Sequence, residues 1–324
     1  MPWHAHALSA WVFFLVSAPA LSTALQVTGL QDPQSFVGDP SGAHYFISNV
    51  NGDPATRDNN GFITKLDGAG KVVERHFIKG GMDGTILHAP KGMAIIGRIL
   101  YVADLETVRG FDIQTGRATY TVSFAHHQGK TETTALADVA HDGNGMLYAS
   151  DTEDDTIYRI DTTRDHAVSV LVRDDSLAGP RGLAVHPKTH HLIVASWHKG
   201  KILDVTPEGT ITELVSNSFF FGRFHNLDGV DFDKWGNMYV SDFTAGKVWR
   251  MHPDGQFKVI AEHLRSPADI SVDRTNHLIL VPYFYANAAE INGLESPVKS
   301  KKRKRTLKDY GFGFPKPEQE SSSP

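Results

Sequence analysis

The residues best able to do chemistry recur in a tetrad that begins with Pro or Leu and leads into an apolar strand. The copies occupy residues 33–36, 90–93, 136–139, 180–183, 227–230 and 267–270. If the copies surround one axis, their second residues form a ring there, and the third residues add two carboxylates. The candidate ligand-binding residues of this axial ring are Gln34, Lys91, Asp138, Arg181, Asp228 and Asp269.

The charged residues of the axial ring allow two interpretations. In the first, Lys91 and Arg181 pair with the three aspartates, and the charges only neutralise each other. In the second, Arg181 binds a carboxylate or phosphate group through two parallel hydrogen bonds, and Lys91 assists. The residue types alone leave both interpretations open, because each requires the same charges near one axis.

Several other kinds of chemistry are excluded by what the chain lacks. None of the 324 residues is a cysteine, so there is no disulfide, no thiolate nucleophile and no Cys-type zinc site. The Gly-x-Ser-x-Gly pattern of a serine hydrolase is also missing. The formal net charge of −5 argues against a generally basic protein that binds nucleic acid. With 40% hydrophobic and 21% charged residues, the composition is that of a globular protein.

The elements that must position the axial ring are visible as a second repeat, a short strand of the pattern apolar-Tyr-apolar-small-Asp. Its copies end at residues 49, 104, 151, 196, 242 and 282, at intervals of 40–55 positions. Intervals of about 40–50 residues are typical of propeller blades. We expect Asp104, Asp151 and Asp242 of this repeat to cap turns by accepting backbone hydrogen bonds rather than to act in catalysis.

Each unit also contains strands joined by short turns rich in Gly, Asp and Pro, the residues that tight hairpins need. No long segment has the 3.6-residue periodicity of a helix. The sequence therefore predicts an all-β fold, a six-bladed β-propeller whose blades each have four antiparallel strands. The sixth unit lacks a fourth strand, and we expect residues 25–30 to supply it, so that an N-terminal strand closes the ring.

The two ends of the chain differ from the repeats. Residues 11–21 form an apolar run that is shorter than the ~18–20 residues needed to cross a bilayer, and small residues follow it. This pattern predicts a signal peptide over residues 1–24, no transmembrane segment, and export to the periplasm or the extracellular space. After a propeller over residues 25–294, the composition of residues 295–324 predicts a flexible tail that is first basic and then Ser-rich.

The tetrads and the Tyr-containing strands resemble those of the regucalcin/gluconolactonase (senescence marker protein) family, particularly its exported bacterial branch. The most specific matches are Tyr-Phe-Ile-Ser-Asn at 45–49, Ala-Pro-Lys-Gly-Met at 89–93, Leu-Asp-Gly-Val at 227–230 and Val-Ser-Asp at 240–242. The resemblance covers about residues 32–294. It implies a six-bladed propeller with the activity of a divalent-metal-dependent lactonase or a related ester hydrolase.

The resemblance also implies a calcium-like or zinc-like ion on the axis. The family holds this ion with a Glu from the first blade, an Asn from the fourth and an Asp from the fifth, while an Asn from the third blade contacts the substrate. Only the fifth-blade residue matches here, at Asp228, because the other positions carry Gln34, Arg181 and Ala137. Two like unit charges about 4 Å apart repel each other by roughly 4 kcal/mol at an effective dielectric near 20. We therefore expect that Arg181 prevents the protein from holding a metal in the family's way.

These observations favour an exported propeller that binds a small ligand, anionic in the second interpretation above, in its axial pocket without a cofactor. An alternative is a metal-dependent lactonase or esterase in which Asp228 binds Ca or Zn with help from Asp138 or His225. A propeller that binds an unknown partner protein is a third interpretation. The sequence does not decide whether the protein is an enzyme, but the resemblance implies that an enzyme would be a lactonase or ester hydrolase.

Overall fold

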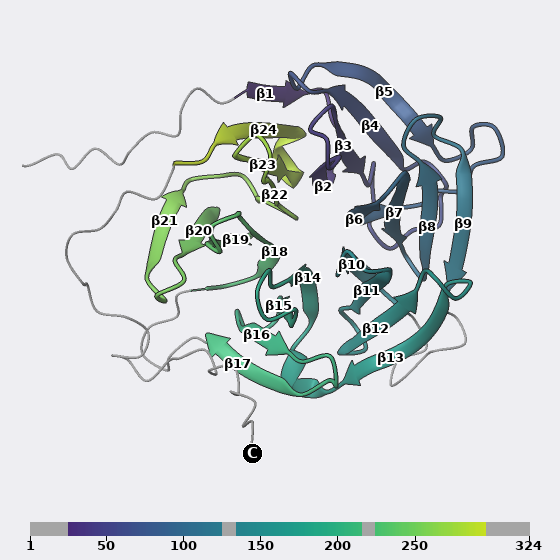
Figure 1. Ribbon diagram of the computed structural model, residues 1–324. Coiled ribbons are helices and arrows are strands. Elements are labelled where there is room, and N and C mark those ends of the chain that lie inside the picture. The colour runs from purple at the N-terminus through teal and green to yellow at the C-terminus, as the bar shows by residue number, and fades with distance from the viewer. Residues whose placement is uncertain (1–24, 125–133, 216–223, 296–324) are drawn as a thin grey trace, which may run out of the picture.

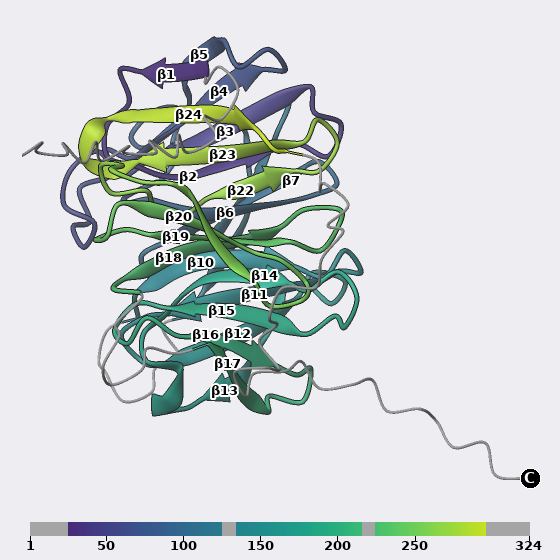
Figure 2. The same cartoon turned by 90° about the vertical axis from the view of Figure 1, so that its left-hand side faces the viewer.

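Six four-stranded antiparallel sheets surround a common axis in the computed structural model, which describes residues 25–124, 134–215 and 224–295 (Figure 1). Figure 2 views the same ring from its side, with β1 and β24 towards one edge and β13 and β17 towards the other. The prediction of an all-β, six-bladed propeller is confirmed. The predicted signal peptide, and the predicted tail beyond residue 295, lie outside the described residues.

Each blade runs from an inner strand beside the axis to an outer strand at the rim. The first blade contains β2 (Pro33–Gly38), β3 (His44–Asn49), β4 (Phe62–Asp67) and β5 (Val72–Lys79), and the second contains β6 (Pro90–Ile96), β7 (Ile99–Asp104), β8 (Thr107–Asp112) and β9 (Ala118–Ser123). The third contains β10 (Leu136–His141), β11 (Met146–Asp151), β12 (Thr156–Asp161) and β13 (Ala167–Arg173), and the fourth contains β14 (Pro180–Val185), β15 (Leu192–Ser196), β16 (Ile202–Val205) and β17 (Ile211–Val215). The fifth contains β18 (Leu227–Phe232), β19 (Met238–Asp242), β20 (Lys247–Met251) and β21 (Phe257–Ala261), and the sixth contains β22 (Ser271–Asp273), β23 (Leu278–Tyr283), β24 (Ala288–Gly293) and β1 (Leu25–Thr28).

The ring is closed by the N-terminal strand, as the sequence predicts. Strand β1 pairs antiparallel with β24 and becomes the outer strand of the sixth blade, with Leu25 opposite Ile291. The inner strand of that blade is shorter than the tetrad predicts, because β22 begins only at Ser271. The backbone N–H of Asp269 instead donates to the carbonyl oxygen of Gln34 at 2.9 Å, so the sixth tetrad also joins the first blade.

The only helices in the described parts of the chain are two 3-10 helices, η1 (Asp175–Leu177) and η2 (Phe284–Ala286). None of the helices described is long and apolar enough to cross a membrane.

Apolar side chains fill the spaces between neighbouring blades. The cluster between the third and fourth blades, for example, combines Tyr148 and Ile157 from one blade with Leu183 and Val194 from the other. Both faces of each blade are therefore buried, and full burial of one such side chain stabilises the fold by about 1.5–3 kcal/mol. Because the apolar contacts lie between the blades, the axis remains available for polar side chains.

The repeated aspartates at the ends of the second strands have the capping role expected for them. Asp104 accepts hydrogen bonds from the backbone N–H groups of His88 and Ala89, at 3.0 and 2.8 Å, and pairs with Arg109 at 2.6 Å. Asp151 and Asp242 accept equivalent bonds from the backbone N–H groups of Ala135 and His225. Each aspartate thereby fixes the residues just before a tetrad, where the chain enters an inner strand.

Candidate functional site

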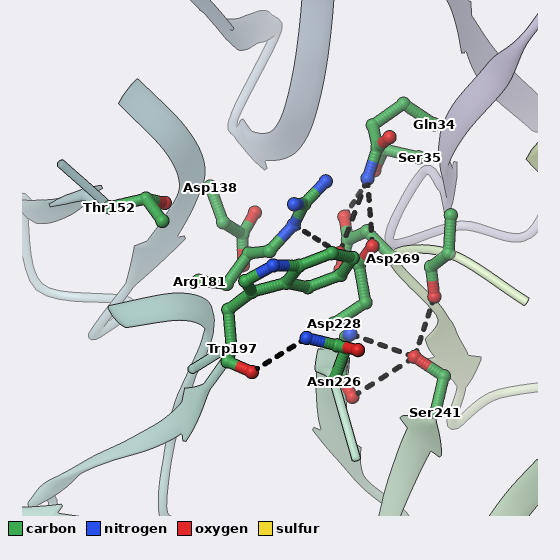
Figure 3. A network of polar contacts seen from close by, with 12 residues as sticks. Gln34, Ser35, Asp138, Thr152, Arg181, Trp197, Asn226, Asp228, Ser241 and Asp269 are labelled. Carbon is green, nitrogen blue, oxygen red and sulfur yellow. Dashed lines mark hydrogen bonds and ion pairs between the residues drawn. The ribbon is translucent and has the colours of Figure 1, made fainter. Parts of the chain in front are cut away.

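Three residues of the predicted axial ring meet directly where the inner strands begin. Gln34, Arg181 and Asp228 come from β2, β14 and β18. The Gln34 amide nitrogen donates to both carboxylate oxygens of Asp228, at 3.2 and 3.3 Å, and Arg181 Nε donates to Oδ1 at 3.0 Å (Figure 3). Asp228 is only 1% exposed, so this carboxylate is held by two donors in a nearly dry environment. Together with Lys91 of β6, these residues form what we call the charged end of the axial channel.

Arg181 also lies over an aromatic ring that the sequence analysis did not single out. The centre of its guanidinium is 4.1 Å from the centroid of the Trp197 indole ring, a cation–π contact. Asn226 donates from its side-chain amide to the Trp197 carbonyl at 3.0 Å and accepts a hydrogen bond from Thr244 at 2.6 Å. The position of Trp197 directly after β15, one copy of the repeated strand, was the only sequence signal that could have found it.

The backbone of the charged end is fixed by serines of the apolar-Tyr-apolar-small-Asp repeat. Ser150 on β11 accepts a hydrogen bond from the Asp138 N–H at 3.1 Å and donates to the carbonyl oxygen of Arg181 at 2.6 Å. Ser48 and Ser241 make the same connection to the next blade, through the carbonyl oxygens of Lys91 and Ala268. These serines belong to the first, third and fifth blades, so they hold tetrad residues of the second, fourth and sixth.

Lys91 is partly buried at the charged end, but its ammonium group forms no hydrogen bond or ion pair with another residue that the structure describes. Burial and the nearby Arg181 charge together lower the pKa of Lys91 to about 8, against the opposing effect of Asp104, Asp151 and Asp228. The charged end therefore carries one cation that is paired and one that is not.

Asp138 and Asp269, the two third-position residues, do not bond to Arg181 or Lys91. Asp138 accepts backbone hydrogen bonds from Val139 at 2.7 Å and from Leu183 of the next blade at 2.8 Å. Asp269 Oδ2 accepts a hydrogen bond from the Ser35 hydroxyl at 2.6 Å. The structure thus divides the six predicted residues into two layers, with Gln34, Lys91, Arg181 and Asp228 in one and these two carboxyls in the other.

Burial raises the pKa of all three buried aspartates of the axis. Burial raises the pKa of Asp228, although Arg181 and Gln34 oppose the rise. Burial, together with the neighbouring charge of Asp269, holds the pKa of Asp138 well above its usual range. Burial raises the pKa of Asp269 to about 8, and the Asp228 charge contributes. At neutral pH, Asp269 is therefore largely a neutral carboxylic acid.

A cavity of about 580 Å³ opens at the other end of the channel, which we call the open end. Its lining comes from the later residues of the inner strands and the turns that follow them, and it includes Asp138 and Asp269 but not Arg181 or Lys91. The wall is largely apolar, formed by Met93, Ile95, Val139, Leu183, Val230 and Ile270. A volume between about 300 and 1,000 Å³ is typical of small-molecule sites. Within the described ranges, no group of three His, Asp or Glu side chains is placed to hold a metal ion.

Comparison with solved structures finds the same fold at low sequence identity. A protein of unknown function from Bacteroides thetaiotaomicron aligns with a TM-score of 0.64 and 14% identity, over 82% of this chain and 70% of that one. Virginiamycin B lyase from Staphylococcus aureus aligns with a TM-score of 0.58 and 13% identity, over 84% and 99% of the two chains. A streptogramin B lyase gives a TM-score of 0.58 and 12% identity, over 85% and 88%. At these identities, the similarity establishes the fold alone.

Sequence comparison is more specific about the family. No curated protein matches the chain significantly. The family model described as the SMP-30/gluconolactonase/LRE-like region, however, matches residues 67–270, which is more than half of the chain and spans the second to the fifth blade. The chain therefore belongs to the SMP-30/gluconolactonase/LRE-like family of propellers.

Proposed function

We propose that this protein is an exported small-molecule-binding propeller that captures an anion at the charged end of its channel. The observation that carries the proposal is the ammonium group of Lys91, which lies near Arg181 without a carboxylate partner among the described residues. A partly buried cation beside a second cation is unfavourable unless an anion compensates it. An anionic ligand would supply that compensation.

Arg181 has the free donors that such a ligand requires. Its Nε is occupied by Asp228, but its two terminal nitrogens form no hydrogen bond with the described residues, and Figure 3 shows them turned away from Asp228. Two parallel N–H groups fit a carboxylate or phosphate through a bidentate contact. The Trp197 ring packs against one face of the planar guanidinium group and limits its rotation. The ligand would bridge Arg181 and Lys91.

The same residues do not fit the divalent cation that the family resemblance implies. Gln34 and Arg181 stand at two of the positions that would supply metal ligands. Both side chains instead donate N–H hydrogen bonds to Asp228. Asp138 cannot readily replace them, because both of its oxygens accept backbone hydrogen bonds. His225 is 60% exposed and lies beside Asp242, with 3.9 Å between its Nδ1 and the Asp242 carboxylate. This donor set argues against the metal-dependent lactonase or esterase considered from the sequence.

Export remains part of the proposal because of residues 1–24, whose apolar run and following small residues are typical of a signal peptide.

Calorimetric titration with inorganic phosphate and with benzoate tests the anion site. We expect Lys91→Met and Arg181→Gln each to weaken binding at least tenfold, since each removes a charge-assisted contact. Wild-type affinity should fall as the pH rises through about 8, because Lys91 then loses its charge. The matched controls are Lys71→Met and Arg117→Gln, which change exposed side chains away from the axis.

Two results would overturn this function. One is anion binding that neither axial substitution weakens relative to the controls. The other is stoichiometric Ca or Zn in the purified protein together with lactone hydrolysis that Asp228→Ala abolishes, which would establish the metal-dependent enzyme instead.

A further inference from the structure

The open end of the channel has a charge opposite to that of the charged end. Six aspartates line its cavity but only one arginine does: Asp39, Asp138, Asp142, Asp231, Asp269 and Asp273 against Arg274. The arginine is itself paired, since Arg274 Nη2 lies 2.5 Å from Asp231 Oδ1. His141 and His186 add no positive charge at neutral pH, because burial lowers the pKa of both imidazoles. Even without Asp138 and Asp269, whose pKa values are raised, four aspartates line the cavity against one paired arginine, so the cavity favours a cation.

One carboxyl at the base of this cavity has an unused oxygen. Asp269 is 7% exposed and lines the cavity. Its Oδ2 accepts the hydrogen bond from Ser35, whereas no residue in the described part of the chain donates to Oδ1. Oδ1 therefore keeps its capacity to accept a hydrogen bond from a molecule in the cavity. A ligand that donates a hydrogen bond would satisfy it.

We propose that the cavity at the open end binds an organic ammonium ion with an apolar body, and that the ammonium group donates to Asp269. The apolar wall, which includes Met93, Leu183 and Val230, would cover the body, and the aspartates around the mouth would attract the charge. This site shares no ligand-contacting residue with the proposed anion site. Its existence is therefore independent of the proposed function.

The charged residues around Asp269 favour its protonated form in the empty cavity, so binding of an ammonium ion changes its protonation. Asp228 and Asp231 from β18 and Asp138 from β10 disfavour its ionised form, whereas Arg181 from β14 favours it but is already paired with Asp228. A bound ammonium adds a cation and thereby stabilises the carboxylate. The proton of Asp269 then leaves to solvent as the amine binds, with no other change in bonding.

Titration calorimetry with three probes of one shape tests the proposal: 4-phenylbutylamine, 4-phenylbutanol and 4-phenylbutanoate. At pH 7 we expect the amine to bind at least tenfold more tightly than the alcohol, and the carboxylate to bind least tightly. Titrations in buffers of different ionisation enthalpy should show the release of up to one proton per amine. Asp269→Asn should weaken the amine at least tenfold and abolish proton release, but leave the affinity for the alcohol within about twofold of wild type.

A second substitution keeps the test informative if Asp269→Asn folds poorly. Arg274→Gln removes the only arginine of the lining, and its side chain is 49% exposed, so we expect an intact fold and a two- to fivefold gain in amine affinity. The proposal fails if the amine and the alcohol bind equally, or if Asp269→Asn leaves amine binding unchanged. It also fails if Ca²⁺ displaces the amine, because the site would then be one for a divalent cation.

Discussion

The two ends of the axial channel are built from the same six inner strands, yet one is filled and the other is open. At the charged end, the strands begin with the long side chains of Gln34, Lys91 and Arg181; Gln34 and Arg181 bond to Asp228, and Lys91 lies near them. At the open end, Ala94, Ala140 and Ala184 line the channel on three consecutive blades, and a cavity of about 580 Å³ remains. Side-chain length at successive positions of one strand therefore decides where the channel is closed.

The ends also differ in how their charges are compensated. Asp228 is paired with the positively charged Arg181, whereas Asp138 and Asp269 accept hydrogen bonds from neutral donors only. One end therefore keeps an unpaired cation, and the other keeps an unpaired carboxyl. Because the unfavourable group differs in sign, substitutions at the two ends should respond to pH in opposite directions.

Asp228→Ala should have the largest effect on stability, because it breaks the charged end. Arg181 would lose its carboxylate and remain near Lys91, and such an uncompensated buried charge costs about 3–5 kcal/mol. Urea unfolding measures this loss, with the exposed Glu208→Ala as the matched control. If Asp228→Ala had the same free energy of unfolding as Glu208→Ala, the pair of Arg181 and Asp228 would contribute nothing to stability.

Asp269→Asn should stabilise the open end increasingly as the pH rises. The pKa of Asp269 lies above its unfolded value, so the native state loses stability as the pH increases from about 4 to about 8. Asn cannot ionise and avoids this loss, while its side-chain oxygen can still accept from Ser35. We expect the difference in unfolding free energy between variant and wild type to grow by about 4 kcal/mol between pH 5 and pH 9. A difference that is constant over this range would contradict the raised pKa.

Lys91→Met should show the opposite pH trend at the charged end, with a smaller magnitude. The pKa of Lys91 is lower in the folded state, so its charge destabilises the fold fully below pH 8 and progressively less as the pH rises towards 10.5. In the absence of an anion, the substitution should stabilise the protein by about 2 kcal/mol at pH 7, after allowance for partial exposure. Thermal unfolding from pH 7 to pH 10, with Lys71→Met as the control, should show this gain diminish. A gain that persists at pH 10 would point to better packing of Met instead.

Much of the fold could be predicted from local sequence. The tetrads and the Tyr-containing strands predict six blades because each repeat forms one hairpin-rich unit with its own turns. The closing strand was predictable from residues 25–30, because the sixth unit lacks a partner that an antiparallel sheet requires. The caps made by Asp104, Asp151 and Asp242 follow from the preference of Asp for turn positions next to backbone N–H groups.

The sequence by itself determined the ring of blades and which residues begin its inner strands. Only the tertiary structure decided that Gln34, Arg181 and Asp228 bond to one another, that Trp197 lies under the guanidinium, and that the cavity opens beyond Asp138 and Asp269. The reason is physical. Hydrogen bonding within a blade depends on neighbouring residues of the chain, whereas Gln34 and Asp228 are 194 positions apart and meet only because the closed ring brings every inner strand to one axis.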